Sequence, residues 1–194
     1  AFSWGAILNA NKTNGTVLVT TSGVEDGQLL TITLWKSGVN YVDDWTKPIT
    51  NNATKFPNYL FQGFPDSLLY TMTADVNNLV GNHAPQKRSS SFGIDTTAPT
   101  IYAIGTSAFS WGAILNPDSY PRTVTVTTSG VEDGQTLTIT LNSATYTSTI
   151  SGNATTVTIP AAALQALTTG VAITMTADVS DLAGNAATQI TSSS

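Results

Sequence analysis

The chain has 194 residues, and hydrophobic residues make up 41% of them, so a folded core is expected rather than disorder. Its net charge is −5, and the seven basic residues are scattered apart from Lys87-Arg88, which excludes a phosphate-binding patch and with it a nucleic-acid partner. There is no cysteine, hence no disulfide and no thiolate metal site, and no apolar run approaches the ~20 residues that span a bilayer.

A long internal repeat begins at the first residue. Residues 1–34 align with 108–141 without a gap, and 26 of the 34 positions are identical. A second block, TMTADVNNLVGN at 71–82, matches TMTADVSDLAGN at 174–185. A period of about 100 residues is too long for a solenoid unit and is the size of an independent β-sandwich. We therefore expect two domains, residues 1–94 and 95–194.

The first copy differs from the second at its start. It has no equivalent of the linker DTTAPT (95–100) or of TIYAIGT (100–106), the strand expected after it. The strand that begins at Thr16, or the last strand, should therefore lack one neighbour within the chain, and such an open edge is a template for a strand from another subunit. Because the chain begins without Met or a signal peptide, we expect a processed product or a piece of a longer protein.

The middle of the first copy is rich in aromatic residues. Residues 35–70 replace the plain Thr-rich hairpin of the second copy. One interpretation is a ligand site in which Trp35, Tyr41 and Trp45 stack on a sugar while Asp43 and Asp44 accept hydrogen bonds from its hydroxyls. Two alternatives remain: the aromatic residues fill the core beneath long loops, or they contact a neighbouring subunit.

The second copy consists almost entirely of predicted strands. Thr alternates with Val, Leu and Ile, the period-two pattern of half-buried strands, and Gly, Asn and Asp mark the turns. A run of seven short strands with one helical turn at 161–167 predicts an all-β fold, namely tandem immunoglobulin-like sandwiches of which the first lacks its N-terminal strand. The expected strands are 100–106, 122–129, 135–142, 144–150, 155–160, 171–179 and 186–193.

Four segments give a more specific resemblance: DTTAPT, VEDGQTLTITLNSATYTSTI, TIPAAALQAL and TADVSDLAGNAAT. They resemble the bacterial immunoglobulin-like repeats in the extender region of giant RTX-type surface adhesins. The resemblance covers residues 95–194, but only 16–34 and 71–82 in the first copy. It implies a structural module of an extracellular, cell-surface stalk, and in that family many such modules bind calcium near domain junctions.

The acidic residues are concentrated at one end of each predicted sandwich. The loop SGVEDGQ (22–28 and 129–135), the loop between the sixth and seventh strands and the linker should meet there, and eight of the 12 acids lie in these segments. Clustered carboxylates repel one another unless a cation or a hydrogen-bond donor compensates, and hard oxygen ligands select calcium over zinc. The alternative is ordinary turn chemistry with the acids in solvent. The candidate ligands are Asp95, Glu132, Asp133, Asp178, Asp181 and Asn185, with Glu25, Asp26, Asp75 and Asn77 in the first copy.

Catalysis has little support in the sequence. A single histidine, no cysteine and no serine elbow leave no nucleophile-base pair, so the chain is not expected to be an enzyme. The function predicted first is a structural module of a surface polymer or adhesin stalk, stiffened by calcium at the domain junction. The alternatives are a filament subunit completed by strand donation and a module that binds a glycan or protein. The expected partners are neighbouring immunoglobulin-like domains, identical subunits, or a glycan, host or biofilm surface.

Overall fold

The computed structural model describes residues 1–3, 7–9, 15–37, 39–102, 121–168 and 170–192. The chain divides into two compact units, Ala1–Thr96 and Thr97–Ser194, and each is described by itself. Within the described ranges both units are built from strands, with only short helical turns, so the predicted all-β class is confirmed.

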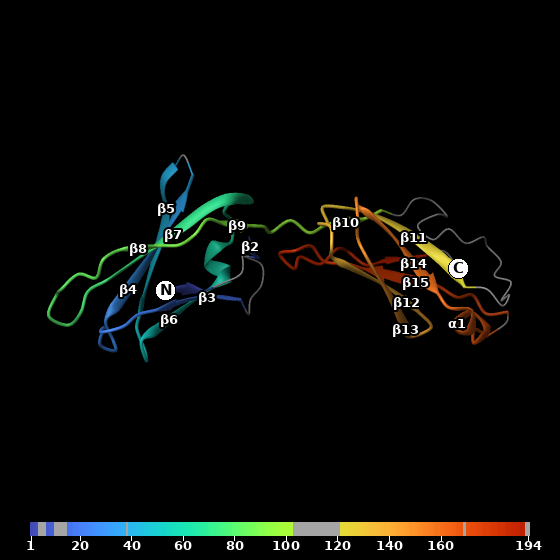
Figure 1. The fold of residues 1–194 in the computed structure, drawn as a ribbon, viewed down its shortest axis with the longest axis horizontal. Helices are drawn as coiled ribbons and strands as arrows, with labels where there is room; N and C mark the ends of the chain where they lie inside the picture. The colour runs from blue at the N-terminus through green and yellow to red at the C-terminus, as the bar shows by residue number, and fades with distance from the viewer. Residues whose placement is uncertain (4–6, 10–14, 38, 103–120, 169, 193–194) are drawn as a thin grey trace. The chain divides into compact units, whose positions relative to one another are not determined.

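The first unit is a sandwich of two sheets (Figure 1). The smaller sheet has the order β1-β3-β6, and the larger has the order β2-β9-β7-β4-β5, with β8 also paired to β7. The strands are β1 (Phe2–Ser3), β2 (Ile7–Leu8), β3 (Thr16–Thr20), β4 (Leu29–Lys36), β5 (Val39–Pro48), β6 (Ala53–Pro57), β7 (Ser67–Val76), β8 (Lys87–Arg88) and β9 (Phe92–Ile94), with the 3₁₀ turn η1 (Asn58–Phe61).

The core of the first unit lies between these sheets. Alternate residues of β4 point inward, because successive side chains of a strand face opposite sides, and Leu30, Ile32 and Leu34 are buried in consequence. Phe56 and Phe61 are fully buried in the same cluster. The core-filling interpretation therefore holds for these two aromatic residues.

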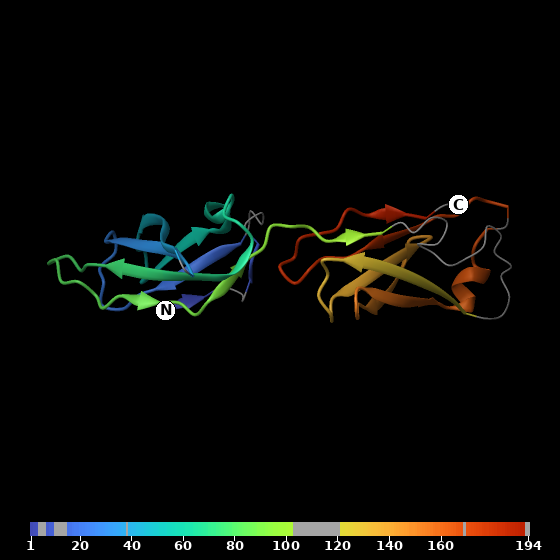
Figure 2. The same cartoon turned by 90° about the horizontal axis from the view of Figure 1, so that it is seen from above.

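The second unit repeats the arrangement (Figure 2). One sheet has the order β10-β11-β14 and the other β13-β12-β15-β16, and their inward residues form one buried cluster. The elements are β10 (Thr100–Ile101), β11 (Arg122–Ser129), β12 (Thr136–Leu141), β13 (Ala144–Thr149), β14 (Ala154–Ile159), α1 (Ala161–Gln165), β15 (Met175–Asp178) and β16 (Ile190–Thr191).

The main difference between the units is the length of one hairpin, which is β4–β5 in the first unit and β12–β13 in the second. In each unit a backbone hydrogen bond joins the two ends of this hairpin, from Gly27 N to Ile49 O at 2.9 Å and from Gly134 N to Ile150 O at 2.9 Å. The first hairpin is six residues longer between these points, 21 positions from Gln28 to Ile49 against 15 from Gln135 to Ile150. The first part of the aromatic segment, through Ile49, thus belongs to a lengthened hairpin on the same framework.

The predicted absence of a first strand in the first unit is wrong in part. β1 pairs with β3, with Phe2 opposite Val19, and Ala1 N donates to Thr20 O at 2.7 Å. In the second unit Tyr102 N donates at 3.1 Å to the oxygen of Thr127, the equivalent of Thr20. Ala1 therefore occupies the register position of Tyr102. The segment AFS supplies a short first strand because its backbone groups reach the edge of β3.

The other predicted elements of the second unit agree with the structure only in part. The expected helical turn at 161–167 is confirmed as α1. The expected strand 171–179 is shorter, because β15 begins only at Met175 and Val171 is 59% exposed. Most of the expected strand 100–106 and the repeated tryptophans, Trp4 and Trp111, lie outside the described residues.

Candidate functional site

The Glu-Asp pair of each repeat joins three loops. In the second unit Glu132 Oε2 accepts a hydrogen bond from Leu182 N at 2.8 Å, and Asp133 Oδ1 accepts one from Gly152 N at 2.7 Å. Leu182 belongs to the loop after β15, and Gly152 to the turn between β13 and β14. We call residues 22–28 and 129–135 the clamp loops, because each holds the two neighbouring loops through these carboxylates.

The first unit makes the same contacts with its own residues. Glu25 Oε2 accepts from Leu79 N at 3.0 Å, and Asp26 Oδ1 accepts from Asn51 N at 2.8 Å. The predicted proximity of the clamp loop to the loop between the sixth and seventh strands is confirmed in both units. In the second unit Thr100 of β10 lies opposite Ser129, so the clamp loop is at the end where the linker arrives, as expected.

The glycine after the acids completes the turn. Gly27 has φ +88° and Gly134 has φ +93°, a left-handed conformation that side chains rarely adopt. The turn places two adjacent carboxylates at its outer bend, where one reaches each neighbouring loop. Backbone amides are the donors, and a carboxylate is a strong acceptor for them. The repeated Glu-Asp-Gly therefore has a direct structural role.

The hydrogen bonds of Glu25 shift its acidity. The amide of Leu79, and after it the backbone amide of Glu25 itself, lower the pKa of this carboxyl from its ordinary value of 4.5. Both donors favour the ionised form.

The loop after β15 is held by a buried carboxylate. Asp181 is 3% exposed and Asn185 is 6% exposed. Asp181 Oδ1 accepts from Asn185 N at 2.7 Å, and Oδ2 accepts from Asn185 Nδ2 at 2.9 Å. In the first unit Asn78 Oδ1 accepts from Asn82 N at 2.8 Å, which is the neutral counterpart of the first of these bonds.

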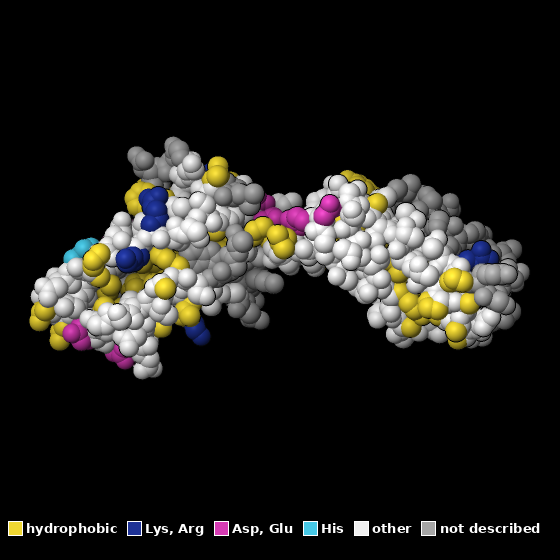
Figure 3. Space-filling view, in the orientation of Figure 1, with side chains coloured by type: hydrophobic (Ala, Val, Ile, Leu, Met, Phe, Trp, Pro, Cys, Tyr) yellow, Lys and Arg dark blue, Asp and Glu magenta, His cyan; other side chains and the backbone are white. Residues whose placement is uncertain are grey.

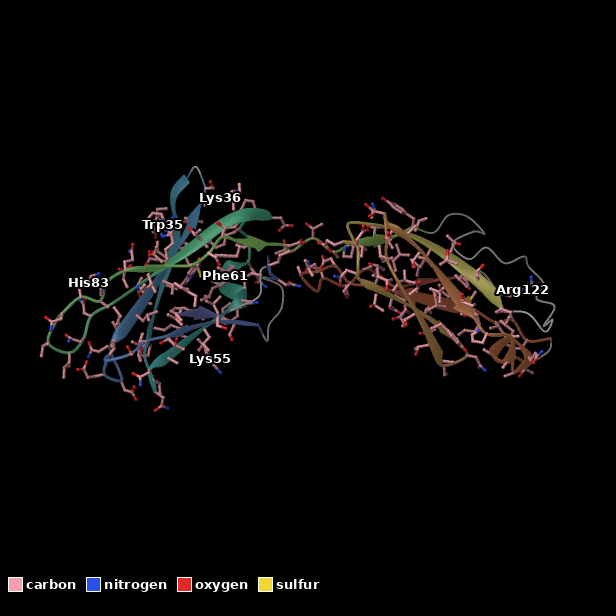
Figure 4. All side chains as sticks on the ribbon, in the orientation of Figure 1. Trp35, Lys36, Lys55, Phe61, His83 and Arg122 are labelled. Atoms are coloured by element: carbon pink, nitrogen blue, oxygen red, sulfur yellow. The ribbon has the colours of Figure 1, made fainter. Side chains whose placement is uncertain are left out.

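A third repeated contact joins the base of this loop. Gln189 Nε2 donates to both carboxylate oxygens of Asp178, at 2.8 and 2.9 Å, and Gln86 Nε2 donates to Asp75 Oδ2 at 2.8 Å. The first unit adds His83, the sole histidine of the chain (Figure 4). Its Nε2 lies 3.4 Å from Asp75 Oδ1, and its Nδ1 lies 2.8 Å from Asn77 Oδ1.

These contacts bear on the predicted calcium ligands. Within each unit the candidate acids accept hydrogen bonds from amide groups, and no three His, Asp or Glu residues of the described ranges come together as a metal-binding group. In both units N–H donors supply the compensation that clustered carboxylates need. Asp95 belongs to the first unit, where its N donates to Leu8 O at 3.1 Å. Calcium at the junction between the units stays a prediction.

The candidate ligand-binding residues separate onto two faces of the larger sheet. Trp45 lies opposite the buried Ile32 and packs edge-on against Phe61 and Phe64, with ring centroids 5.0 and 6.1 Å apart. Asp43 lies opposite the buried Leu34 and accepts a hydrogen bond from Asp44 N at 2.9 Å. Trp45 and Asp43 therefore lie on the inner face of the sheet, apart from Trp35, Tyr41 and Asp44.

The other three candidates meet on the outer face. Trp35 and Tyr41 form an edge-on pair at 6.4 Å, and the hydroxyl of Tyr41 donates to Asp44 Oδ1. Trp35, which is labelled in Figure 4, donates from its Nε1 to Thr73 Oγ1 at 2.9 Å. The guanidinium of Arg88 lies 5.7 Å from the Trp35 ring centroid. Sequence reasoning missed Arg88, because only the pairing of β8 with β7 brings it to this face. The hydrogen bond to Asp44 raises the pKa of Tyr41.

The sheets of the two units define the class as an all-β fold of immunoglobulin-like sandwiches. No protein-family model matches the chain, and no curated protein matches its sequence. Among the helices of the described residues, none is long and apolar enough to cross a membrane.

Solved structures similar to the chain include bacterial adhesin domains. One is a calcium-stabilised adhesin that helps an Antarctic bacterium reach out and bind ice (24% identity, 97% of this chain and 45% of that chain covered, TM-score 0.44). Another is a 1.5-MDa bacterial ice-binding adhesin, studied for host cell surface retention (22%, 97% and 59%, TM-score 0.43). A third is a bacterial immunoglobulin-like domain from the M. primoryensis ice-binding adhesin (27%, 50% and 90%, TM-score 0.31). The chain spans about half the length of the first two.

Proposed function

We propose that the chain is a structural module of an extracellular surface polymer or adhesin stalk, in which its two sandwiches serve as successive spacers. The observation that carries this proposal is the duplicated clamp. Both units use Glu and Asp of the clamp loop to hold the same two neighbouring loops through backbone amides. The chain has few acids, and in both units it uses them to hold the same loops in place. A module that serves as a spacer needs such a fixed structure.

The aromatic cluster on the outer face supports the same role. The polar groups of Trp35, Tyr41 and Asp44 already have partners in Thr73 and in one another, and Arg88 lies over the Trp35 ring. A sugar would have to displace these contacts before it could stack. The filament alternative by strand donation also loses support, because β1 pairs with the edge of β3 from which it was inferred.

The test is an exchange of modules in the full-length protein of the producing organism. Residues 1–194 are replaced by two unrelated β-sandwich domains of the same total length, and attachment of intact cells is measured. A spacer role predicts attachment close to that of the native protein. A matched variant, Trp35→Ala with Tyr41→Ala in the native chain, should also leave attachment unchanged. Loss of attachment in both experiments would overturn the spacer role in favour of binding by the outer face.

Calcium stiffening at the junction is the finer part of the proposal. It is supported by the sequence, which places Asp95 in the linker and Glu132 and Asp133 in a loop at the end of the second unit where that linker arrives. Cell-surface location is likewise part of the proposal. An antibody raised against the chain should label intact, unpermeabilised cells, and labelling only after permeabilisation would contradict it.

A further inference from the structure

The strand β13 is an open edge of the second unit. In the order β13-β12-β15-β16 it pairs only with β12. The two-residue turn before it has positive φ at both Asn142 and Ser143, so Leu141 and Ala144 form the hydrogen-bonded pair that closes the hairpin. The alternation of an antiparallel ladder then directs the backbone N–H and C=O of every second residue, from Thr145 onward, away from β12.

Two residues carry the available edge groups. Thr149 O already accepts a hydrogen bond from Thr155 Oγ1 at 2.8 Å. Thr145 and Thr147 present an N–H and a C=O each, and in the described part of the chain no backbone partner faces them. The side chain between them, Tyr146, packs partly buried against the core.

This edge lacks the features by which proteins prevent edge-to-edge pairing. Charged side chains, proline and bulges serve that purpose on natural edges. No Asp, Glu, Lys, Arg or His occurs between Gly134 and Ala177, and β13 has neither a proline nor a shift of register against β12. Hydrophobic side chains gather on the face where β12, β13 and α1 lie (Figure 3).

The equivalent edge of the first unit carries all of these features. The pairing registers of β4 with β5 and of β12 with β13 align the two edge strands residue by residue. Asp43 and Asp44 stand where the second unit has Ala144 and Thr145. Lys47 and Pro48 replace Ser148 and Thr149, and β5 also has a bulge against β4. One framework thus has a protected edge in one unit and an unprotected edge in the other.

We propose that β13 pairs antiparallel with β13 of a second copy of this chain. Thr145 of each copy lies opposite Thr147 of the other, so that the outward groups of both residues form four backbone hydrogen bonds, and the twofold axis passes beside Tyr146. The two Tyr146 side chains are then neighbours on the inner face, and threonines pair on the outer face. This contact joins copies side by side and goes beyond the role of a spacer along one chain.

A second copy is favoured over other occupants because the edge complements itself. Two uncharged strands meet without repulsion, and the same four groups serve as donors and acceptors on both sides. The equivalent edge strand of the first unit, β5, would place Asp43 and Asp44 against the partner, and Pro48 would remove a donor.

Sedimentation of the full chain at increasing concentration tests the pairing. The native chain should form a dimer, and Thr147→Pro should weaken the dimer at least tenfold, because proline removes the outward N–H without affecting a bond to β12. Thr147→Lys should do the same by charge repulsion, which guards against misfolding of the proline variant. The matched control is Thr46→Lys on β5, the equivalent position of the first unit, which should leave dimerisation unchanged. A native chain that stays monomeric to millimolar concentration overturns the proposal, as does a dimer that both Thr147 variants retain.

Cross-linking tests the register. Because the chain has no cysteine, Thr145→Cys and Thr147→Cys each introduce a single thiol. With a short bis-maleimide, a mixture of the two variants should form covalent dimers much faster than either variant alone. Equal rates in all three samples would mean random collision and would overturn the register.

Discussion

Replacing Asp181 by alanine should destabilise the second unit by about 3 kcal/mol. The carboxylate is almost fully buried and accepts two hydrogen bonds, from the N and the Nδ2 of Asn185, at 2.7 and 2.9 Å. A hydrogen bond to a charged group contributes about 1.5–3 kcal/mol, and both donors would be left buried without this acceptor. The two bonds share one side chain and are not additive, so about 3 kcal/mol is expected rather than their sum.

Calorimetry of the whole chain can measure this loss. For a unit of about 100 residues, 1 kcal/mol moves the melting temperature by roughly 4–8 °C, so the transition of the second unit should fall by roughly 12–24 °C. Asp181→Asn keeps one acceptor oxygen and should lose about half as much.

The first unit provides the matched control. Asn78 is neutral and accepts one counterpart of these bonds, from Asn82 N at 2.8 Å, near the surface. Asn78→Ala should therefore cost about 1 kcal/mol, in the transition of the first unit only. If Asp181→Ala costs no more than Asn78→Ala, the buried carboxylate does not hold its loop.

Three further predictions concern the other carboxylates. The pKa of Glu25 is lower in the folded state than in the unfolded state. The ionised carboxylate should therefore stabilise the fold fully above the unfolded-state pKa, and this stabilisation should be lost as pH falls through the folded-state pKa. Glu25→Gln should remove this pH-dependent contribution from the acid-unfolding profile. The pKa of Tyr41 is raised chiefly by its hydrogen bond to Asp44, so Asp44→Asn should move it back towards 10.0 in an alkaline titration of phenolate absorbance, and an unchanged value would contradict that hydrogen bond. A calcium site at the junction should stabilise the chain by about 2.7 kcal/mol at a hundredfold excess over Kd and should be lost in Asp133→Ala, whereas identical melting curves with calcium and with chelator would exclude it.

The fold could be predicted from the sequence where alternation was long and regular. The pattern RTVTVTTS predicted β11 with its exact bounds, because every second residue is Val or Thr facing a core. The segment around Val171 has the same alternation, yet only Met175 onward pairs with β12. Periodicity indicates which residues are able to form a strand, whereas the neighbouring strand decides how many of them do.

The sequence predicts which loops meet at the clamp loops but not which groups their acids contact. The order of the strands placed the clamp loop beside the loop after β15, and the contact of Glu132 with Leu182 confirms it. The donors themselves are backbone amides, which leave no trace in the sequence, so the sequence does not distinguish acids held by amides from acids that bind a metal. The cluster of Trp35 with Arg88 was missed for a related reason, since it depends on a short pairing of β8 with β7.

The pairing of β2 with β9 has a mechanical consequence. These strands are the second and the last of the first unit, and they run parallel, with Ile7 opposite Gly93 and Leu8 opposite Ile94. When the unit is pulled at both ends, the force acts toward the N-terminus on β2 and toward the C-terminus on β9. The two parallel strands then slide past each other, and all their hydrogen bonds are loaded in shear at the same time. An antiparallel pair pulled at its open end would instead unzip one bond at a time. A module tethered at both ends would therefore resist tension with β2 and β9 acting together.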